Sequence, residues 1–124
     1  MTGRFAKSSK IQGIGNFVVR KERISKLAER GFTKIELNKL VAPPRTLARR
    51  HETLSLEESD RVQRLERILE QAIRVLGSGE KANKWLRSKN RALNNAIPID
   101  LLVSETGAHQ IEMQLHAIDY GMYA

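Results

Sequence analysis

"SLEESDRVQRLERILEQAIRVLGSG", residues 55–79, holds the longest regular pattern in the chain. Ser55 and Glu58 have the spacing of a capping box, in which a hydroxyl and a carboxylate each bond a backbone N–H group at the start of a helix. Apolar residues then keep helical spacing for about six turns, at Val62, Leu65, Ile68, Leu69, Ala72, Val75 and Leu76. GSG at 77–79 ends the pattern. The stretch predicts one long helix.

Downstream, the sequence predicts shorter helices around a loop. A helix is expected over about 80–87, and Ser78 between two glycines fits a helix cap rather than an activated serine. A short helix near 98–103 begins at Pro98, and a last helix covers about 107–120. The loop between them contains the Asn94-Asn95 pair, which can make a tight turn.

Upstream, three short helices are expected. Asn16 can cap the first, over about 17–30, which ends at Gly31 and has an apolar face of Phe17, Ile24, Leu27 and Ala28. Thr33 and Glu36 form a capping box for the second, which runs through about Val41 with apolar Ile35, Leu37 and Leu40. The third is PRTLARRHE, residues 44–52, since proline is tolerated in a first helical turn. Residues 1–15 have no period and are expected to form a flexible arm. No alternating pattern is long enough for a strand, so the fold class is all-α.

Composition restricts the kind of protein. A chain of 124 residues, 40% apolar, suits one domain or two very small ones. The absence of cysteine excludes disulfides and thiol nucleophiles, and a reducing cytoplasm is the natural compartment. No apolar run approaches the ~20 residues that span a bilayer, so no membrane association is expected. The N-terminus is basic but lacks the apolar segment of a secretory signal.

Positive charge is concentrated in the first part of the chain. Residues 1–53 carry 13 Lys/Arg and 4 Asp/Glu, a net +9, whereas residues 54–124 carry 9 and 10, a net −1. A basic segment of this kind is typical of phosphate binding, although a solubilising surface is the alternative. The split suggests two separate tasks in one chain.

Within the basic part, TKIELNKLVAPPRTLARRHE (33–52) has the length of a helix-turn-helix. Its second helix would enter the major groove, where arginine can bond guanine, while Leu47 and Ala48 face inward. Many DNA-binding turns have glycine where Val41 or Ala42 stands here, so a basic hairpin without a DNA role is the alternative. The expected DNA-binding residues are Lys34, Arg45, Thr46, Arg49 and Arg50.

Three motifs in the second half resemble the C-terminal domain of the Xre/MbcA/ParS antitoxin family. They are EKANKWL at 80–86, LNNAIPIDLL at 93–102 and TGAHQIEMQLHAIDYG at 106–121, in the family's order and spacing. Upstream, RTLARR at 45–50 and LSLEESDRVQRLERIL at 54–69 resemble the family's linker and long helix, so the resemblance covers about residues 24–124. One departure is Asn95, where glycine is expected. Asparagine tolerates positive φ, so the turn can survive.

The resemblance implies a type II antitoxin that is not an enzyme. Such proteins silence a cognate toxin, and through a helix-turn-helix they repress their own operon. Xre members pair with RES-domain toxins, which resemble ADP-ribosylating enzymes and deplete NAD, while ParS-like members neutralise related toxins. The C-terminal region of these antitoxins covers the toxin's active-site cleft, so steric exclusion of NAD is the implied mechanism.

The residues point to partner contacts in the same region. Trp85 offers a large amphipathic surface that either anchors an interface or fills the core of the small domain. On the last helix, Ile111, Leu115, Ile118 and Met122 form a stripe that suits docking on that core. The opposite face has Met113 and Tyr120, which favour contact with a partner, although a solvated face is the alternative. The expected toxin-binding residues are Trp85, His109, Met113, His116, Tyr120, Gly121, Met122, Tyr123 and Ala124.

The tail after Gly121 has a tyrosine, and a ring with a terminal carboxylate would fit a nucleotide pocket. A frayed chain end without a role is the alternative.

Enzymatic chemistry finds little support. His109, Glu112 and His116 share a helix face, but no further metal ligand accompanies them. The sequence has no phosphate-cradling glycine loop and no plausible nucleophile–base pair, so no catalytic residue, metal or cofactor is expected.

The predicted organisation is an arm over 1–15, a helix-turn-helix domain over 16–54, a connecting and dimerisation helix over 55–77 and a toxin-binding domain over 78–124. A homodimer is expected because Leu69, Ile73 and Leu76 widen the apolar face of the long helix, although packing between the two halves could also cover them. The expected partners are thus a RES-domain toxin, operator DNA and a second copy. The alternative function is a stand-alone transcription regulator whose C-terminal half dimerises or senses a ligand.

Overall fold

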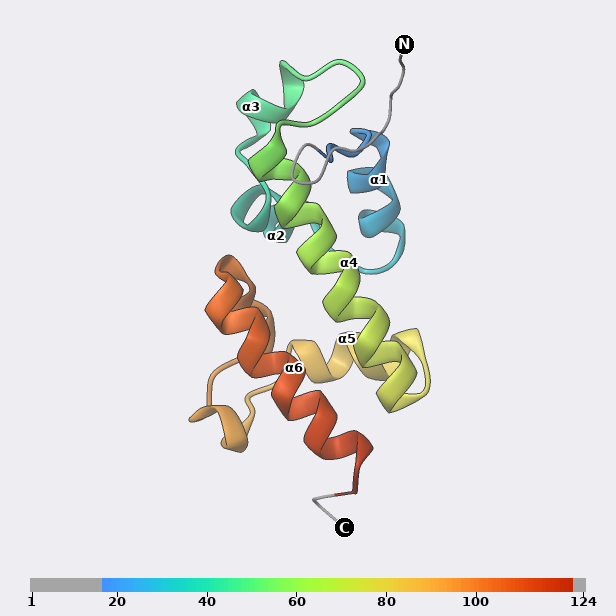
Figure 1. Ribbon diagram of the computed structural model, residues 1–124, viewed down its shortest axis with the longest axis vertical. Helices are drawn as coiled ribbons and strands as arrows, with labels where there is room; N and C mark the ends of the chain where they lie inside the picture. Colours follow the sequence, from blue (N-terminus) through green and yellow to red (C-terminus); the bar gives the residue numbers. More distant parts are fainter. Residues whose placement is uncertain (1–16, 122–124) are drawn as a thin grey trace. The chain divides into compact units, whose positions relative to one another are not determined.

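The structure, a computed structural model, describes residues 17–121 (Figure 1). All named elements in this range are helical, with η marking 3-10 helices: α1 (Glu22–Glu29), α2 (Lys34–Leu40), α3 (Pro44–Ala48), α4 (Leu56–Leu76), α5 (Gly79–Leu86), η1 (Arg91–Leu93), η2 (Pro98–Val103) and α6 (Glu105–Asp119). The predicted all-α class is confirmed for this range. None of these helices is both long and apolar enough to cross a bilayer.

The chain divides into two compact units between Gln63 and Arg64, within α4. The first unit contains α1, α2, α3 and the beginning of α4. The second contains the rest of α4 with α5, η1, η2 and α6. The predicted arm over 1–15, the cap Asn16 and the tail residues Met122, Tyr123 and Ala124 lie outside the described residues.

The first helix is shorter than predicted, since α1 begins at Glu22 rather than near Phe17. Residues before it are extended and pair with the segment that leads into α4. Lys21 N–H donates to Glu52 O (2.8 Å), and Leu54 N–H donates to Val19 O (3.0 Å). Successive side chains of an extended segment face opposite sides, so Val19 is buried while its neighbour Val18 is exposed. The expected apolar face of the helix fails at Phe17, which precedes the helix and is exposed, and at Ala28, which lies on α1 but is also exposed.

The second helix begins where the sequence predicts. Thr33 Oγ1 accepts from Glu36 N–H (3.1 Å) and Glu36 Oε1 accepts from Thr33 N–H (2.9 Å), so the capping box is confirmed. Leu37 and Leu40 are buried, but Ile35 is 81% exposed. Val41, the C-cap, offers its carbonyl to Arg61 of α4 at 2.9 Å, which ties the end of α2 to the long helix.

The long helix is confirmed over Leu56–Leu76, and its capping box is present. Ser55 N–H donates to Glu58 Oε1 (2.9 Å), and Ser55 Oγ accepts from Glu58 N–H (3.2 Å). Glu58 also accepts two hydrogen bonds from Arg50, both 2.8 Å. Ser59, fully buried, accepts from Val19 N–H (2.9 Å). One turn of α4 therefore holds both the loop after α3 and the segment before α1.

The second unit has an apolar core between α4, α5, η2 and α6. Its buried side chains are Leu65, Ile68, Leu69, Ala72, Ala82, Leu86, Pro98, Ile99, Leu102, Ala108, Ile111 and Leu115. Both α5 and α6 begin at a serine cap, as Ser78 Oγ accepts from Lys81 N–H and Ser104 Oγ accepts from Gly107 N–H. The predicted cap role of Ser78 is thus confirmed.

The Asn-Asn turn adopts the conformation that the sequence allows. Asn94 and Asn95 have φ of 59° and 66°, both in the left-handed region. Asn90 closes the turn, since its carbonyl accepts from Asn95 N–H (2.8 Å) and its N–H donates to Ala96 O (3.0 Å). Asparagine therefore takes the position expected for glycine, because its short polar side chain tolerates this region.

Candidate functional site

The short third helix presents fewer of the predicted DNA-binding residues than expected. α3 ends at Ala48, so Arg49 is its C-cap and Arg50 lies beyond it; neither lies on the helix, contrary to the prediction. Arg45 on α3 and Lys34 in the first turn of α2 are exposed, as is Arg49, while Thr46 is half-buried. Leu47 is only half-buried and Ala48 is exposed, so the predicted inward face is wrong at Ala48.

Arg50 has a structural partner that explains where α3 ends. Its guanidinium holds the carboxylate of Glu58 bidentately, and its carbonyl accepts from Lys21 Nζ (3.1 Å). Hydrogen bonds, chiefly from Arg50 and then from Ser55, lower the pKa of Glu58 to about 2 against the effect of burial. A side chain engaged in this way is less available to DNA than Arg45 or Arg49.

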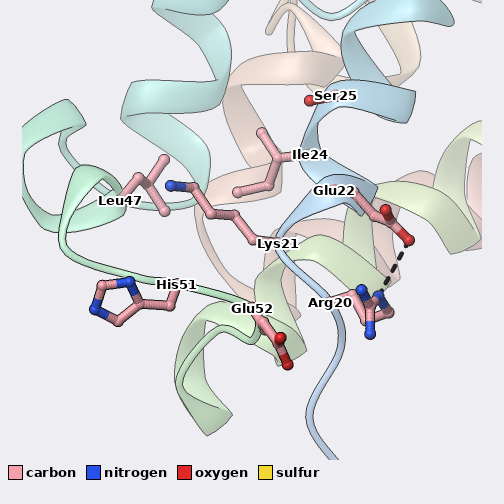
Figure 2. Close-up of a pocket in the computed structure, with 8 residues that line it drawn as sticks. All are labelled: Arg20, Lys21, Glu22, Ile24, Ser25, Leu47, His51 and Glu52. Atoms are coloured by element: carbon pink, nitrogen blue, oxygen red, sulfur yellow. Dashed lines mark hydrogen bonds and ion pairs between the residues drawn. The ribbon is translucent and has the colours of Figure 1, made fainter.

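A pocket of about 350 Å³ lies beside the start of α1 (Figure 2). Leu47 of α3 and Ile24 of α1 lie on either side of it, with Lys21 between them. Its cations are engaged locally, because Arg20 pairs with Glu22 (3.2 Å) and Lys21 bonds the Arg50 carbonyl. The pocket explains why Leu47 is only half-buried.

In the second unit, four predicted toxin-binding residues on α6 and its C-cap lie together on one exposed face, which we call the α6 face: His109, Met113, His116 and, as the C-cap, Tyr120. Met113 is 59% and Tyr120 76% exposed. The His116 and Tyr120 rings stack with centroids 6.0 Å apart. Gly121, also predicted, is exposed with φ of 72° and ends the helix. An apolar side chain this exposed beside stacked rings is suited to protein contact.

The side of α6 that adjoins the α6 face is fixed to α4, and its Glu112 lies 3.9 Å from His109. Arg67 donates to Glu112 (2.9 Å) and Glu105 (2.9 Å), and Arg64 donates to Glu105 (3.2 Å) and to the Leu102 carbonyl (3.2 Å). The hydrogen bond from Arg67 lowers the pKa of the Glu105 carboxyl. Ile111 and Leu115 are buried as predicted. The α6 face is therefore presented by a helix held by both ion pairs and apolar packing.

Trp85 is half-buried, and it lines a hollow of about 330 Å³ with Ile118. A second hollow, of about 420 Å³, adjoins it, since Ala92 and Gln114 line both. Together they form a depression between η1 and α6, the η1–α6 groove, whose lining residues are Trp85, Asn90, Arg91, Ala92, Leu93, Asn94, Gln110, Met113, Gln114, Ala117 and Ile118.

The groove joins two predicted contact residues, Trp85 and Met113, that the sequence left unconnected. Sequence reasoning missed Arg91, Ala92 and Gln110. The available signal was the cation-rich segment KANKWLRSKNR, residues 81–91, which lacks any carboxylate.

Two further expectations concern groups of side chains. Among residues 17–121, no three His, Asp or Glu side chains are grouped so as to hold a metal ion.

Leu69, expected to widen the dimerisation face of α4, is fully buried in the single chain, whereas Ile73 and Leu76 are half-buried. Leu69 is therefore unavailable to a second copy.

The family match to known proteins lies within the second unit. Residues 71–121 match the model of the "Antitoxin Xre/MbcA/ParS C-terminal toxin-binding domain". The chain is 35% identical over 100 residues to the antitoxin Xre of Pseudomonas putida KT2440, covering 77% of this chain and 62% of that protein. It is 30% identical over 86 residues to the antitoxin Xre of Yersinia enterocolitica, covering 66% and 58%. The chain thus spans about three fifths of the length of these curated relatives.

The fold also has a solved counterpart. A chain in the crystal structure of the M. tuberculosis MbcT–MbcA toxin–antitoxin complex superposes with a TM-score of 0.60. The match covers 84% of this chain and 96% of that one, at 24% identity. Likeness at this identity supports the fold alone, over a larger share of the chain than the family match covers.

Proposed function

Because residues 71–121 belong to the Xre/MbcA/ParS C-terminal toxin-binding domain family, we propose that this chain is the antitoxin of a type II toxin–antitoxin system. Its second unit binds and neutralises a toxin protein, and its first unit binds operator DNA. The observation that carries the proposal is the α6 face, which exposes Met113 and Tyr120 within the matched segment.

The proposed partner is a RES-domain toxin that depletes NAD, as the resemblance to Xre members implies. Neutralisation is steric: the second unit covers the active-site cleft and excludes NAD, and the antitoxin itself catalyses nothing. The proposal includes a contribution of residues 122–124 to this cover.

Neutralisation is tested by co-expressing the chain with the protein encoded by the adjacent reading frame, and by scoring growth and cellular NAD. Replacing the exposed Met113 with Asp should abolish the rescue, because a charge would be buried at the interface. Val103→Asp is the matched control, since Val103 is similarly exposed (54%) but lies on η2. Full growth and normal NAD with Met113→Asp would remove the α6 face from the proposal.

The tail is tested separately. Deleting residues 122–124 should leave complex formation measurable while weakening neutralisation. If growth beside the toxin stays at the full-length level, the tail has no part in covering the active site.

For the first unit, we propose that Lys34, Arg45 and Arg49 contact operator DNA, with Thr46 beside them on α3. Support comes from the exposure of the three cations and from the three-residue connection, 41–43, between α2 and α3. Arg50 is left out of the proposed contacts, because its guanidinium is held by Glu58 and its backbone is bonded to Lys21 and Leu47. Two copies would read two half-sites about one helical turn apart.

A gel shift at moderate salt tests this assignment. Arg45→Ala with Arg49→Ala should weaken binding to the promoter fragment while leaving thermal unfolding unchanged. The control is Arg74→Ala with Lys81→Ala, which removes the same charge from exposed positions of the second unit. Equal shifts for the two double variants would show that only net charge matters.

A further inference from the structure

We propose that the η1–α6 groove binds an acidic segment of the toxin polypeptide that also offers an apolar side chain. This inference rests on the proposed function and names the chemistry by which the site selects its partner. It follows from the charge, polarity and shape of the groove.

The residues that line the η1–α6 groove include a cation and no carboxylate. Arg91 is the one charged lining residue of the groove, and it is exposed. Lys84 and Lys89 are the chain neighbours of the lining residues Trp85 and Asn90, and both are exposed. Within residues 17–121, these three cations have no ion-pair partner. Exposed cations without an ion-pair partner favour a negatively charged partner.

The second unit keeps its carboxylates elsewhere. On α6, Glu105 and Glu112 pair with arginines of α4, and helical spacing places both carboxylates away from the groove-lining residues Gln110 and Gln114. Although residues 54–124 have a net charge of −1, the groove itself is therefore positive. This local excess is what an acidic segment would neutralise.

The remaining lining indicates a polypeptide rather than a small anion. Trp85 and Ile118 form an apolar wall in one hollow, and Met113 lies in the other. Side-chain amides of Asn94 and Gln110 line the second hollow, and amides both donate to and accept from peptide groups. Apolar anchor sites with a polar, charged rim are typical of protein–protein contacts.

Ala92 allows charge to be tested separately from shape. It is exposed, it lines both hollows, and only its backbone N–H is used, donating to Asn90 Oδ1 at 2.9 Å. Ala92→Glu and Ala92→Lys add side chains of similar length and opposite charge. Binding of each variant to the purified protein from the adjacent reading frame is measured by calorimetry, and thermal unfolding verifies the fold.

We expect Ala92→Glu to weaken binding at least ~10-fold more than Ala92→Lys, because like charges repel across a desolvated contact. The affinity of the unaltered chain should fall with added salt, and that of Ala92→Glu should fall less. Wild-type affinity in both variants would overturn the groove as the contact. Equal weakening in both would overturn the acidic chemistry. Absence of binding by the unaltered chain would instead reject the proposed function, so the two failures are distinguishable.

Discussion

A β-carbon at position 107 would lie 1.9 Å from the carbonyl oxygen of Leu101, because the first turn of α6 runs directly against η2. Such a contact is shorter than any van der Waals separation, and the obstructing atoms belong to the backbone. Glycine at 107 is therefore what allows α6 and η2 to approach so closely.

Gly107→Ala should lower the free energy of unfolding by about 3 kcal/mol, since backbone must move to admit the methyl group. Gly79→Ala is the matched control, because nothing lies within 4 Å of its β-carbon and it stands in the first turn of α5. That substitution should be neutral or stabilise by up to ~1 kcal/mol. Urea unfolding of both variants measures the difference, and equal stabilities would contradict the packing described.

Glu58→Gln should destabilise the protein by about 2–3 kcal/mol, because it removes the carboxylate that accepts from both Arg50 and the Ser55 backbone. Glu57→Gln, one position earlier in the same first turn, changes an exposed side chain and should alter stability by less than ~0.5 kcal/mol. Thermal or urea unfolding at neutral pH compares them. A similar small effect at both positions would show that the Arg50–Glu58 pair contributes little.

The stability of the protein at low pH should depend on the same Glu58 carboxylate. Glu58 has a folded-state pKa of about 2, lowered from 4.5 chiefly by the Arg50 hydrogen bonds. A carboxyl whose pKa is lower in the folded than in the unfolded state stabilises the fold at pH values above the unfolded-state pKa. This contribution is lost as the pH falls toward the folded-state pKa. We expect up to ~3 kcal/mol to disappear between about pH 5 and pH 2. Glu58→Gln should flatten the stability profile in this window, and an unchanged slope would contradict the assignment.

The stability of variants at position 95 should follow the tolerance of each residue for positive φ. At φ of 66°, Asn95→Gly should be neutral or slightly stabilising, whereas Asn95→Ala should lose about 1 kcal/mol. Unfolding of the three proteins under one condition gives the order. An alanine variant as stable as the glycine variant would mean that the turn relaxes to another conformation.

Capping chemistry made most of the fold predictable. The boxes at Thr33–Glu36 and Ser55–Glu58 depend only on local spacing, and both form as the sequence indicates. The beginning of α1 was not predictable in the same way. Residues 19–21 have helical neighbours in sequence, but they bond to Glu52, Leu54 and Ser59, which are at least 31 positions away in the chain. Pairing at that distance leaves no local pattern.

The candidate sites were predictable to different extents. The α6 face follows from helical periodicity, so the exposure of Met113 and Tyr120 could be expected. The place of Arg50 could not, because an arginine that binds DNA and one that holds a buried glutamate look alike in sequence. The η1–α6 groove depends on a 3-10 turn folding beside a helix about twenty residues later. The sequence signal for the groove was the run of cations at 81–91.

The turn at Asn94-Asn95 also affects how the purified protein ages. Asparagine deamidates when the next backbone nitrogen attacks its side-chain amide, and a following glycine offers the least hindrance to that attack. Here the following residue has a β-carbon, and its nitrogen donates to Asn90 O at 2.8 Å. The asparagine that replaces the expected glycine thus protects its neighbour chemically. An Asn95→Gly preparation, stable at first, would accumulate isoaspartate at position 94 during storage.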